Sequence, residues 1–109
     1  MDALSSTLHA LADPTRRAIL SRLAGGDATI NDLAAPFDMT LPAVSKHIKV
    51  LESAGLVKKR KVAQSRPCTL DPAPLQAVDA WLKEYRQFWE GSLDRLEAYI
   101  HELKDQNHE

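Results

Sequence analysis

The segment TLPAVSKHIKVLESAGLVKKRK, residues 40–61, joins the pattern of an amphipathic helix directly to four consecutive cations. At 100° per residue, one side of a helix over residues 40–54 is apolar and the other is polar. The apolar side comprises Leu41, Val44, Ile48 and Leu51, and the polar side comprises Pro42, Ser45, Lys46, Lys49 and Ser53. Such a helix packs one side on a core and leaves the other for solvent or a partner.

Capping signals set the limits of this helix and of the structure after it. Thr40 is an N-cap residue, Pro42 lies in the first turn, where its missing N–H is harmless, and Gly55 ends the helix. Residues 56–62 and 66–70 then predict two short strands, which together form a hairpin over about residues 56–70.

The same signals predict three shorter helices upstream. The first covers about residues 2–12, and Asp13-Pro14 then opens a second helix that runs to about Ala24. Thr29 and Asp32 have capping-box spacing and open a third helix over about residues 30–36. The residues expected to be buried in the second and third helices are Ala18, Ile19, Leu23, Ile30, Leu33 and Ala34.

Residues 74–104 predict one long helix with a continuous apolar stripe whose members are spaced alternately three and four apart. So long an apolar face is more than the preceding residues can cover, which predicts a dimer through this helix and the first one. The expected interface residues are Leu4, Leu8, Leu11, Leu82, Tyr85, Trp89, Leu93, Leu96 and Ile100.

The predicted architecture is mainly α with a small β-hairpin (α+β), in the order α-α-α-α-β-β-α. Two short helices joined by a tight turn and followed by a basic hairpin predict a winged helix-turn-helix. At 109 residues we expect a single domain over residues 1–109.

Positive charge is concentrated in one part of a nearly neutral chain. The formal net charge is −1, yet residues 40–66 carry seven cations against Glu52 alone. A basic stripe of this kind indicates a polyanionic partner, although a solvated charged face gives the same pattern. In the helix, small residues allow close approach to a DNA groove while Lys46 and Lys49 can reach phosphates or guanine acceptors. Hairpin cations can contact phosphates.

Several classes of protein and site are not expected. One cysteine, Cys68, excludes an internal disulfide and a zinc site built from several cysteines of one chain. The N-terminus lacks a signal-peptide pattern and no apolar run is long enough to span a bilayer, so we expect a cytoplasmic protein. No catalytic motif or phosphate-binding glycine loop is present, and we expect no enzyme activity, no cofactor and no metal.

The segments LADPTRRAILSRL (11–23), TINDLA (29–34) and LPAVSKHIKVLESAGLVKKRK (41–61), with the closing long helix, resemble the ArsR/SmtB family of bacterial winged-helix regulators. The resemblance implies a homodimeric repressor that binds double-stranded DNA with an inverted repeat and is released by an inducer. It assigns the recognition helix Thr40, Leu41, Pro42, Ala43, Ser45, Lys46, His47 and Lys49. It assigns backbone contacts to the wing, with the cations Lys58, Lys59, Arg60, Lys61 and Arg66.

The metal-binding patterns of the family are missing. Its metal-sensing members carry a Cys-x-Cys pattern on the helix before the recognition helix, where this chain reads INDLAAP. A second family pattern, Asp-x-His with His-x-x-Glu on the last helix, is not met by His101 and His108. The resemblance therefore implies a regulator that responds to a non-metal signal, such as a small-molecule inducer.

Five alternatives remain open from the residues. His47 either packs locally or contacts DNA. His101 and His108 could hold a metal across a dimer, and Cys68, whose cationic neighbours would favour a thiolate, could sense redox state. The aromatic cluster Trp81, Tyr85, Phe88 and Trp89 is either interface core or the lining of an inducer pocket. Finally, the basic face could bind an acidic protein instead of DNA.

Overall fold

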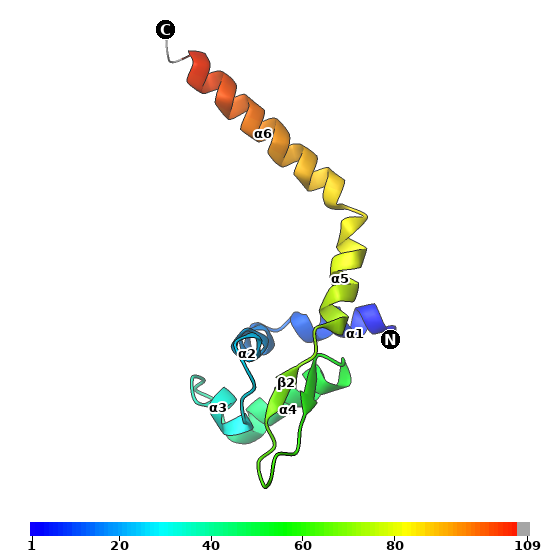
Figure 1. Cartoon of the computed structure of the whole chain (residues 1–109), viewed down its shortest axis with the longest axis vertical. Helices are drawn as coiled ribbons and strands as arrows, with labels where there is room; N and C mark the ends of the chain where they lie inside the picture. The colour runs from blue at the N-terminus through cyan, green and yellow to red at the C-terminus, as the bar shows by residue number, and fades with distance from the viewer. Residues whose placement is uncertain (107–109) are drawn as a thin grey trace. The chain divides into compact units, whose positions relative to one another are not determined.

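The computed structural model describes residues 1–106 and divides into two compact units, Met1–Val78 and Asp79–Glu109 (Figure 1). The elements are α1 (Ala3–Leu11), α2 (Pro14–Ala24), α3 (Ile30–Ala34), α4 (Leu41–Ser53), β1 (Val57–Lys59), β2 (Cys68–Leu70), α5 (Ala73–Lys83) and α6 (Arg86–Gln106). This confirms a mainly helical winged helix-turn-helix with a two-stranded hairpin. The single-domain assignment over residues 1–109 stays a prediction.

The predicted N-caps are confirmed, because each side chain accepts a hydrogen bond from the backbone of the first helical turn. Asp13 Oδ2 accepts from the N–H of Arg16 at 3.1 Å and so begins α2. Thr29 and Asp32 form both hydrogen bonds of a capping box at the start of α3. Thr40 Oγ1 accepts from the N–H of Ala43 at 3.3 Å, which starts α4.

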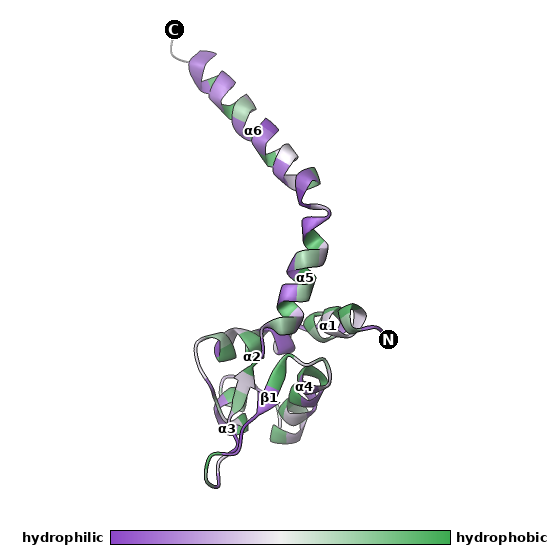
Figure 2. Cartoon of the chain, turned by 45° about the vertical axis from the view of Figure 1, so that its right-hand side comes forward, coloured by the Kyte–Doolittle hydropathy of each residue, from purple (hydrophilic) through white to green (hydrophobic). Residues whose placement is uncertain are grey.

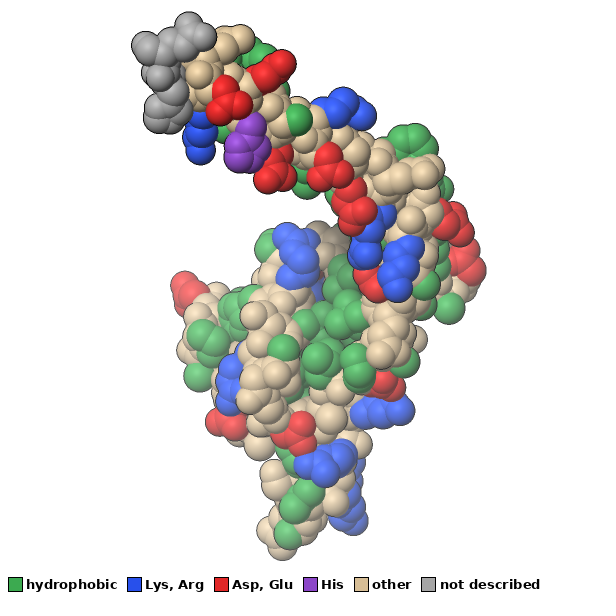
Figure 3. Space-filling view, turned by 45° about the horizontal axis from the view of Figure 1, so that its top comes forward, with side chains coloured by type: hydrophobic (Ala, Val, Ile, Leu, Met, Phe, Trp, Pro, Cys, Tyr) green, Lys and Arg blue, Asp and Glu red, His purple; other side chains and the backbone are tan. Residues whose placement is uncertain are grey.

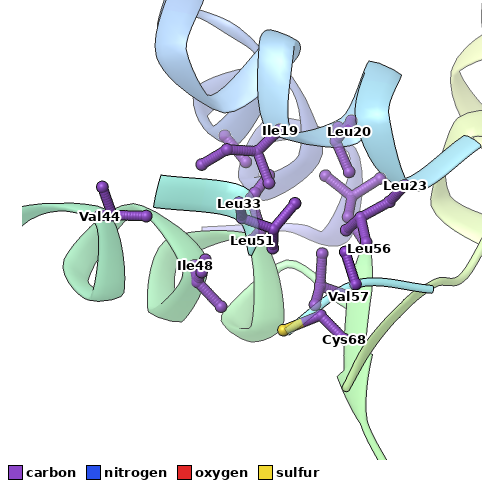
Figure 4. Close-up of a cluster of buried hydrophobic side chains, with 12 residues drawn as sticks. Ile19, Leu20, Leu23, Leu33, Val44, Ile48, Leu51, Leu56, Val57 and Cys68 are labelled. Atoms are coloured by element: carbon purple, nitrogen blue, oxygen red, sulfur yellow. The ribbon is translucent and has the colours of Figure 1, made fainter. Parts of the chain in front are cut away.

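The core of the first unit draws on all four of its N-terminal helices and on the hairpin (Figure 4). The buried apolar residues are Ala10, Ile19, Leu20, Leu23, Ala28, Leu33, Val44, Ile48, Leu51, Leu56, Val57 and Cys68. Two sequence expectations are wrong here. Leu20 rather than Ala18 is buried on α2, and Leu41, expected on the apolar side of α4, is 47% exposed because it lies in the first turn, at the edge of the stripe.

The two paired strands of the hairpin are shorter than the strands that the sequence predicts over residues 56–62 and 66–70. β1 and β2 are antiparallel, with Val57 opposite Leu70 and Lys59 opposite Cys68. Beyond them Arg60 N donates to the carbonyl of Pro67 at 2.9 Å, but Pro67 has no N–H with which to continue the ladder. Cys68 also exchanges both backbone hydrogen bonds with Ala28, so the segment after α2 is tied to the hairpin.

The predicted long helix over residues 74–104 is instead two helices, which adds one helix to the predicted order. At the break, Glu84 N donates to Trp81 O and Tyr85 N donates to Leu82 O, so tighter i to i−3 bonds replace the α-helical pattern. The rings of Trp81 and Tyr85 pack edge to face at this turn, with centroids 5.6 Å apart. Neither Gly nor Pro occurs between residues 83 and 87, so the sequence carries no breaker signal.

Apolar residues recur along α6 without being buried (Figure 2). The exposed members are Phe88, Trp89, Leu93, Leu96, Tyr99, Ile100 and Leu103. Within residues 1–106, no helix combines the length and hydropathy needed to cross a membrane.

We predict that Ile48→Ala lowers the free energy of unfolding by about 2–5 kcal/mol, because it removes a side chain that is completely buried in α4. Urea denaturation followed by circular dichroism measures the loss. Leu41→Ala on the same helix is the matched control and should cost less than about 1 kcal/mol, since Leu41 is exposed. Equal losses in the two variants would contradict the described orientation of α4.

Candidate nucleic-acid interface

The outward face of α4 carries most of the predicted recognition residues. Thr40, Leu41, Pro42, Lys46 and Lys49 are exposed, and Ala43, Ser45 and His47 are half-buried. Lys46 and Lys49 form no ion pair with any residue from 1 to 106, so their ammonium groups are available to a partner. The buried side of the same helix holds Val44, Ile48 and Leu51, which fixes this face outward.

His47 lies on the flank of that face and contacts α2. Its Nδ1 is 3.3 Å from Nη1 of Arg16 and 3.9 Å from Oδ2 of Asp13. The hydrogen bond from the N–H of Arg16 lowers the pKa of the Asp13 carboxyl from its ordinary value, and the positive charge of the Arg16 side chain acts in the same direction. Asp13 is therefore charged at neutral pH and serves both as the cap of α2 and as a neighbour of the recognition helix.

Arg16 and Arg17 hold the end of α1, a role that the sequence reasoning missed. Arg16 donates from Nε to the carbonyl of Ala10 at 2.7 Å and from Nη2 to that of His9 at 3.0 Å. Arg17 Nη1 donates to the carbonyl of Leu11 at 2.7 Å. All three carbonyls lie in the last turn of α1. That of His9 also accepts from the N–H of the C-cap residue Ala12 at 3.2 Å, whereas those of Ala10 and Leu11 have no donor within the helix. The available signal was the pair of arginines in the first turn of α2, one residue after Asp13-Pro14.

The first three cations of the hairpin run are paired within the chain. Lys58 Nζ is 3.0 Å from Asp71 Oδ2 and Lys59 Nζ is 3.2 Å from Glu52 Oε1. Arg60 Nη2 forms an ion pair with Asp27 Oδ2 at 2.5 Å. The expectation that the whole run faces a partner must therefore be refined, because these three side chains tie the hairpin to α4, to the loop before α3 and to the start of α5.

Lys61 and Arg66 are the exposed hairpin cations that make no ion pair with residues 1–106. They flank the tip, where Val62 and Ser65 exchange backbone hydrogen bonds and Ala63 has a φ of 55°. Figure 3 shows Lys and Arg side chains gathered along this projecting hairpin. Positive charge on a protruding loop suits contact with a phosphate backbone.

The predicted dimer residues are mostly uncovered in the single chain. Leu8, Leu82, Tyr85, Trp89, Leu93, Leu96 and Ile100 are exposed, and Leu4 and Leu11 are half-buried. Leu11 packs partly against the core of its own unit. In the aromatic cluster Trp81 is half-buried, and Tyr85, Phe88 and Trp89 are exposed.

The residues considered for sensing differ in their surroundings. Cys68 is fully buried, and burial raises the pKa of its thiol although the charge of Lys59 opposes this, so the expected thiolate is not favoured. His101 Nε2 lies 3.9 Å from Glu97 Oε1 on exposed α6. His108 lies outside the described residues. Over residues 1–106, no cluster of three or more His, Cys, Asp or Glu side chains is placed to hold a metal ion.

Two shallow hollows flank α4 in the first unit. One lies between α1 and the second half of α4 and is lined by residues that include Ser6, His9, Lys49 and Ser53. The other lies between α3 and the first turns of α4 and is lined by Ile30, Asn31, Leu41, Pro42 and Ser45. The second hollow therefore continues the outward face of the recognition helix onto α3.

Comparisons with known proteins agree with this geometry. A family model described as a helix-turn-helix domain matches residues 11–60. The chain is 44% identical to the HTH-type transcriptional regulator Rv2034 of Mycobacterium tuberculosis over 78% of this chain and 77% of that protein. It is 32% identical to the transcriptional repressor SdpR of Bacillus subtilis over 75% of this chain and 91% of that one.

Among solved structures, an ArsR family transcriptional regulator superimposes with a TM-score of 0.75 at 47% identity, covering 82% of this chain and 98% of that chain. These relatives are transcriptional regulators and not enzymes. Sequence identity, coverage and fold therefore agree on one conclusion: the chain belongs to the ArsR/SmtB family of winged helix-turn-helix, DNA-binding transcriptional regulators.

Proposed function

We propose that this regulator is a homodimeric repressor that binds an inverted-repeat operator through the outward face of α4 and the hairpin tip. The observation that carries the proposal is the orientation of α4, whose buried stripe presents outward Lys46 and Lys49, two cations that form no ion pair within residues 1–106. A helix of this kind fits the major groove, and its N-terminal turns reach base edges. The repressor role is supported by the similarity to SdpR, which is named a transcriptional repressor.

The dimer is supported by α6. Its exposed leucines, isoleucine and aromatics form an apolar face that a regulator of this size does not leave in water. A two-fold axis would place two recognition helices in successive major grooves, roughly 34 Å apart, which requires an operator of matching symmetry. Because its DNA target would lie on the chromosome, we infer that the protein is cytoplasmic and associated with the nucleoid. We also propose that an effector, such as a small non-metal inducer, releases the protein from DNA.

The direct test is sequence-specific binding. Selecting duplexes from a random library with the wild-type protein should yield an inverted repeat, bound at least about a thousandfold more tightly than random DNA at 0.15 M salt. Footprinting upstream of the protein's own gene then tests autoregulation. Equal affinity for selected and random duplexes would remove sequence-specific repression and leave general DNA binding or an acidic protein partner.

We predict that Lys46→Ala and Lys49→Ala each weaken binding to the selected duplex by about three- to thirtyfold, because each removes a free cation from the outward face of α4. Gel-shift titration measures the change. Lys104→Ala, which removes the same charge from α6 in the other unit, should leave affinity within about twofold. Unchanged affinity in both α4 variants would exclude this face as the DNA-contacting surface.

We further predict that the hairpin cations differ in their contribution. The double variant Lys61→Ala/Arg66→Ala should flatten the slope of log K against log salt by about 1–2, since each free cation that contacts a phosphate releases counterions. The matched double variant Lys58→Ala/Lys59→Ala removes the same charge from ion-paired positions and should change the slope less. A larger change in the second variant would show that the ion pairs open when DNA binds.

Dimerisation should depend on the apolar face of α6. We predict that Leu96→Glu raises the dimer dissociation constant at least about tenfold, because the interface would have to bury a charge where it now offers an exposed leucine. Sedimentation equilibrium measures the constant. Glu97→Gln, at the adjacent exposed position, should change it little. A wild-type protein that is monomeric at micromolar concentration would refute the dimer.

A further inference from the structure

Arg16 connects two helices that are distant in sequence. Its Nε and Nη2 donate to the carbonyls of Ala10 and His9 at the end of α1, and its Nη1 contacts Nδ1 of His47 on α4. The backbone N–H of Arg16 donates a hydrogen bond to the Asp13 carboxylate. The guanidinium plane is therefore fixed on one side by two carbonyls, and the remaining nitrogen is directed at a single atom of the recognition helix.

This contact determines which nitrogen of His47 carries the proton. A guanidinium has only donors, so Nδ1 must accept the hydrogen bond from Arg16, and the proton of the neutral ring then lies on Nε2. The carboxylate of Asp13 would favour the opposite tautomer, but it is 3.9 Å from Nδ1 and accepts from the backbone of Arg16. The shorter contact with Arg16 decides the tautomer.

The other nitrogen of the ring is open to solvent. Nε2 of His47 has no hydrogen-bond partner in the part of the chain that the structure describes. Among residues 1–106, Thr69 Oγ1 is the only buried side-chain nitrogen or oxygen that lacks a hydrogen-bond partner. Since Nε2 of the half-buried His47 also lacks a partner but is not among the buried atoms, it must be accessible to solvent. The result is an N–H donor at the surface, beside the outward face of α4.

We propose that Arg16 is a positioning residue for DNA binding, holding His47 in the Nε2–H tautomer so that this group donates to an acceptor atom of the bound DNA. The proposal rests on the proposed function, since it requires DNA on α4. The proposal also combines the two interpretations of His47, local packing and DNA contact. The local contact of Nδ1 with Arg16 leaves the proton on Nε2, which can then donate to DNA. Because Arg16 also donates to carbonyls of α1, this side chain connects the end of α1 to the recognition helix.

The first test needs no DNA. Long-range ¹H–¹⁵N spectra of the wild-type protein at about pH 8, where an ordinary histidine is neutral, should show His47 with a protonated Nε2 and an unprotonated Nδ1. Arg16→Lys should produce a mixture of both tautomers, because an ammonium group on a shorter chain does not reproduce the directed Nη1 contact. A wild-type His47 protonated at Nδ1 would overturn the proposal.

The second test measures affinity for the selected duplex and for a random duplex. His47→Ala should weaken binding about three- to tenfold, whereas His47→Gln, whose side-chain amide offers an N–H near the position of Nε2, should restore most of the affinity. A loss on both duplexes identifies a phosphate oxygen as the acceptor, and a loss on the selected duplex alone identifies a base edge. Wild-type affinity of His47→Ala on both duplexes would overturn the proposal.

A double-mutant cycle separates positioning from a general effect on the fold. Arg16→Lys should weaken DNA binding in the wild-type background but add little to His47→Ala, since Arg16 is proposed to act through His47. Circular dichroism and denaturation confirm that each variant is folded. Additive losses would show that Arg16 acts by another route and would overturn its positioning role. Failure of the wild-type protein to bind any duplex would refute the proposed function instead, and the tautomer result would stand independently.

Discussion

The structure depends on the packing of one apolar stripe on α4. Val44, Ile48 and Leu51 are completely buried among residues of the other helices and the hairpin, so α4 cannot rotate about its axis without exposing them. Burying each such side chain is worth about 1.5–3 kcal/mol, more than any single surface contact on the opposite face. The direction of Lys46 and Lys49 is therefore a consequence of the core and not of the lysines themselves.

Tertiary contacts divide the basic charge of residues 40–66 into two groups. Lys58, Lys59 and Arg60 are held by carboxylates from three other segments, and exposed pairs of this kind contribute little energy individually. The base of the hairpin is held mainly by the buried Leu56, Val57 and Cys68, and the ion pairs direct the three cations toward the rest of the chain. Lys61 and Arg66, near the tip, stay without such partners among the described residues. Adjacent cations in one run thus perform different tasks.

The second set of contacts that organises the interface centres on Arg16. It caps the open carbonyls at the end of α1 and reaches His47 on α4, while the neighbouring Asp13 begins α2. The N-cap and first turn of α2 therefore contact both α1 and α4. This explains physically why the sequence DPTRR follows the first helix: the aspartate and proline start α2, and the arginines close α1.

The sequence by itself determined the starts of α2, α3 and α4, the hairpin, the fold class and the outward face of α4, because these follow from local caps and from periodicity. Only the tertiary structure decided which of Ala18 and Leu20 is buried, that Leu41 is exposed, and that Cys68 is enclosed with its thiol pKa raised. It also decided the break at Glu84 and Tyr85 and the pairing of the hairpin cations. Burial and ion pairing depend on which distant segments meet, and no local pattern records that.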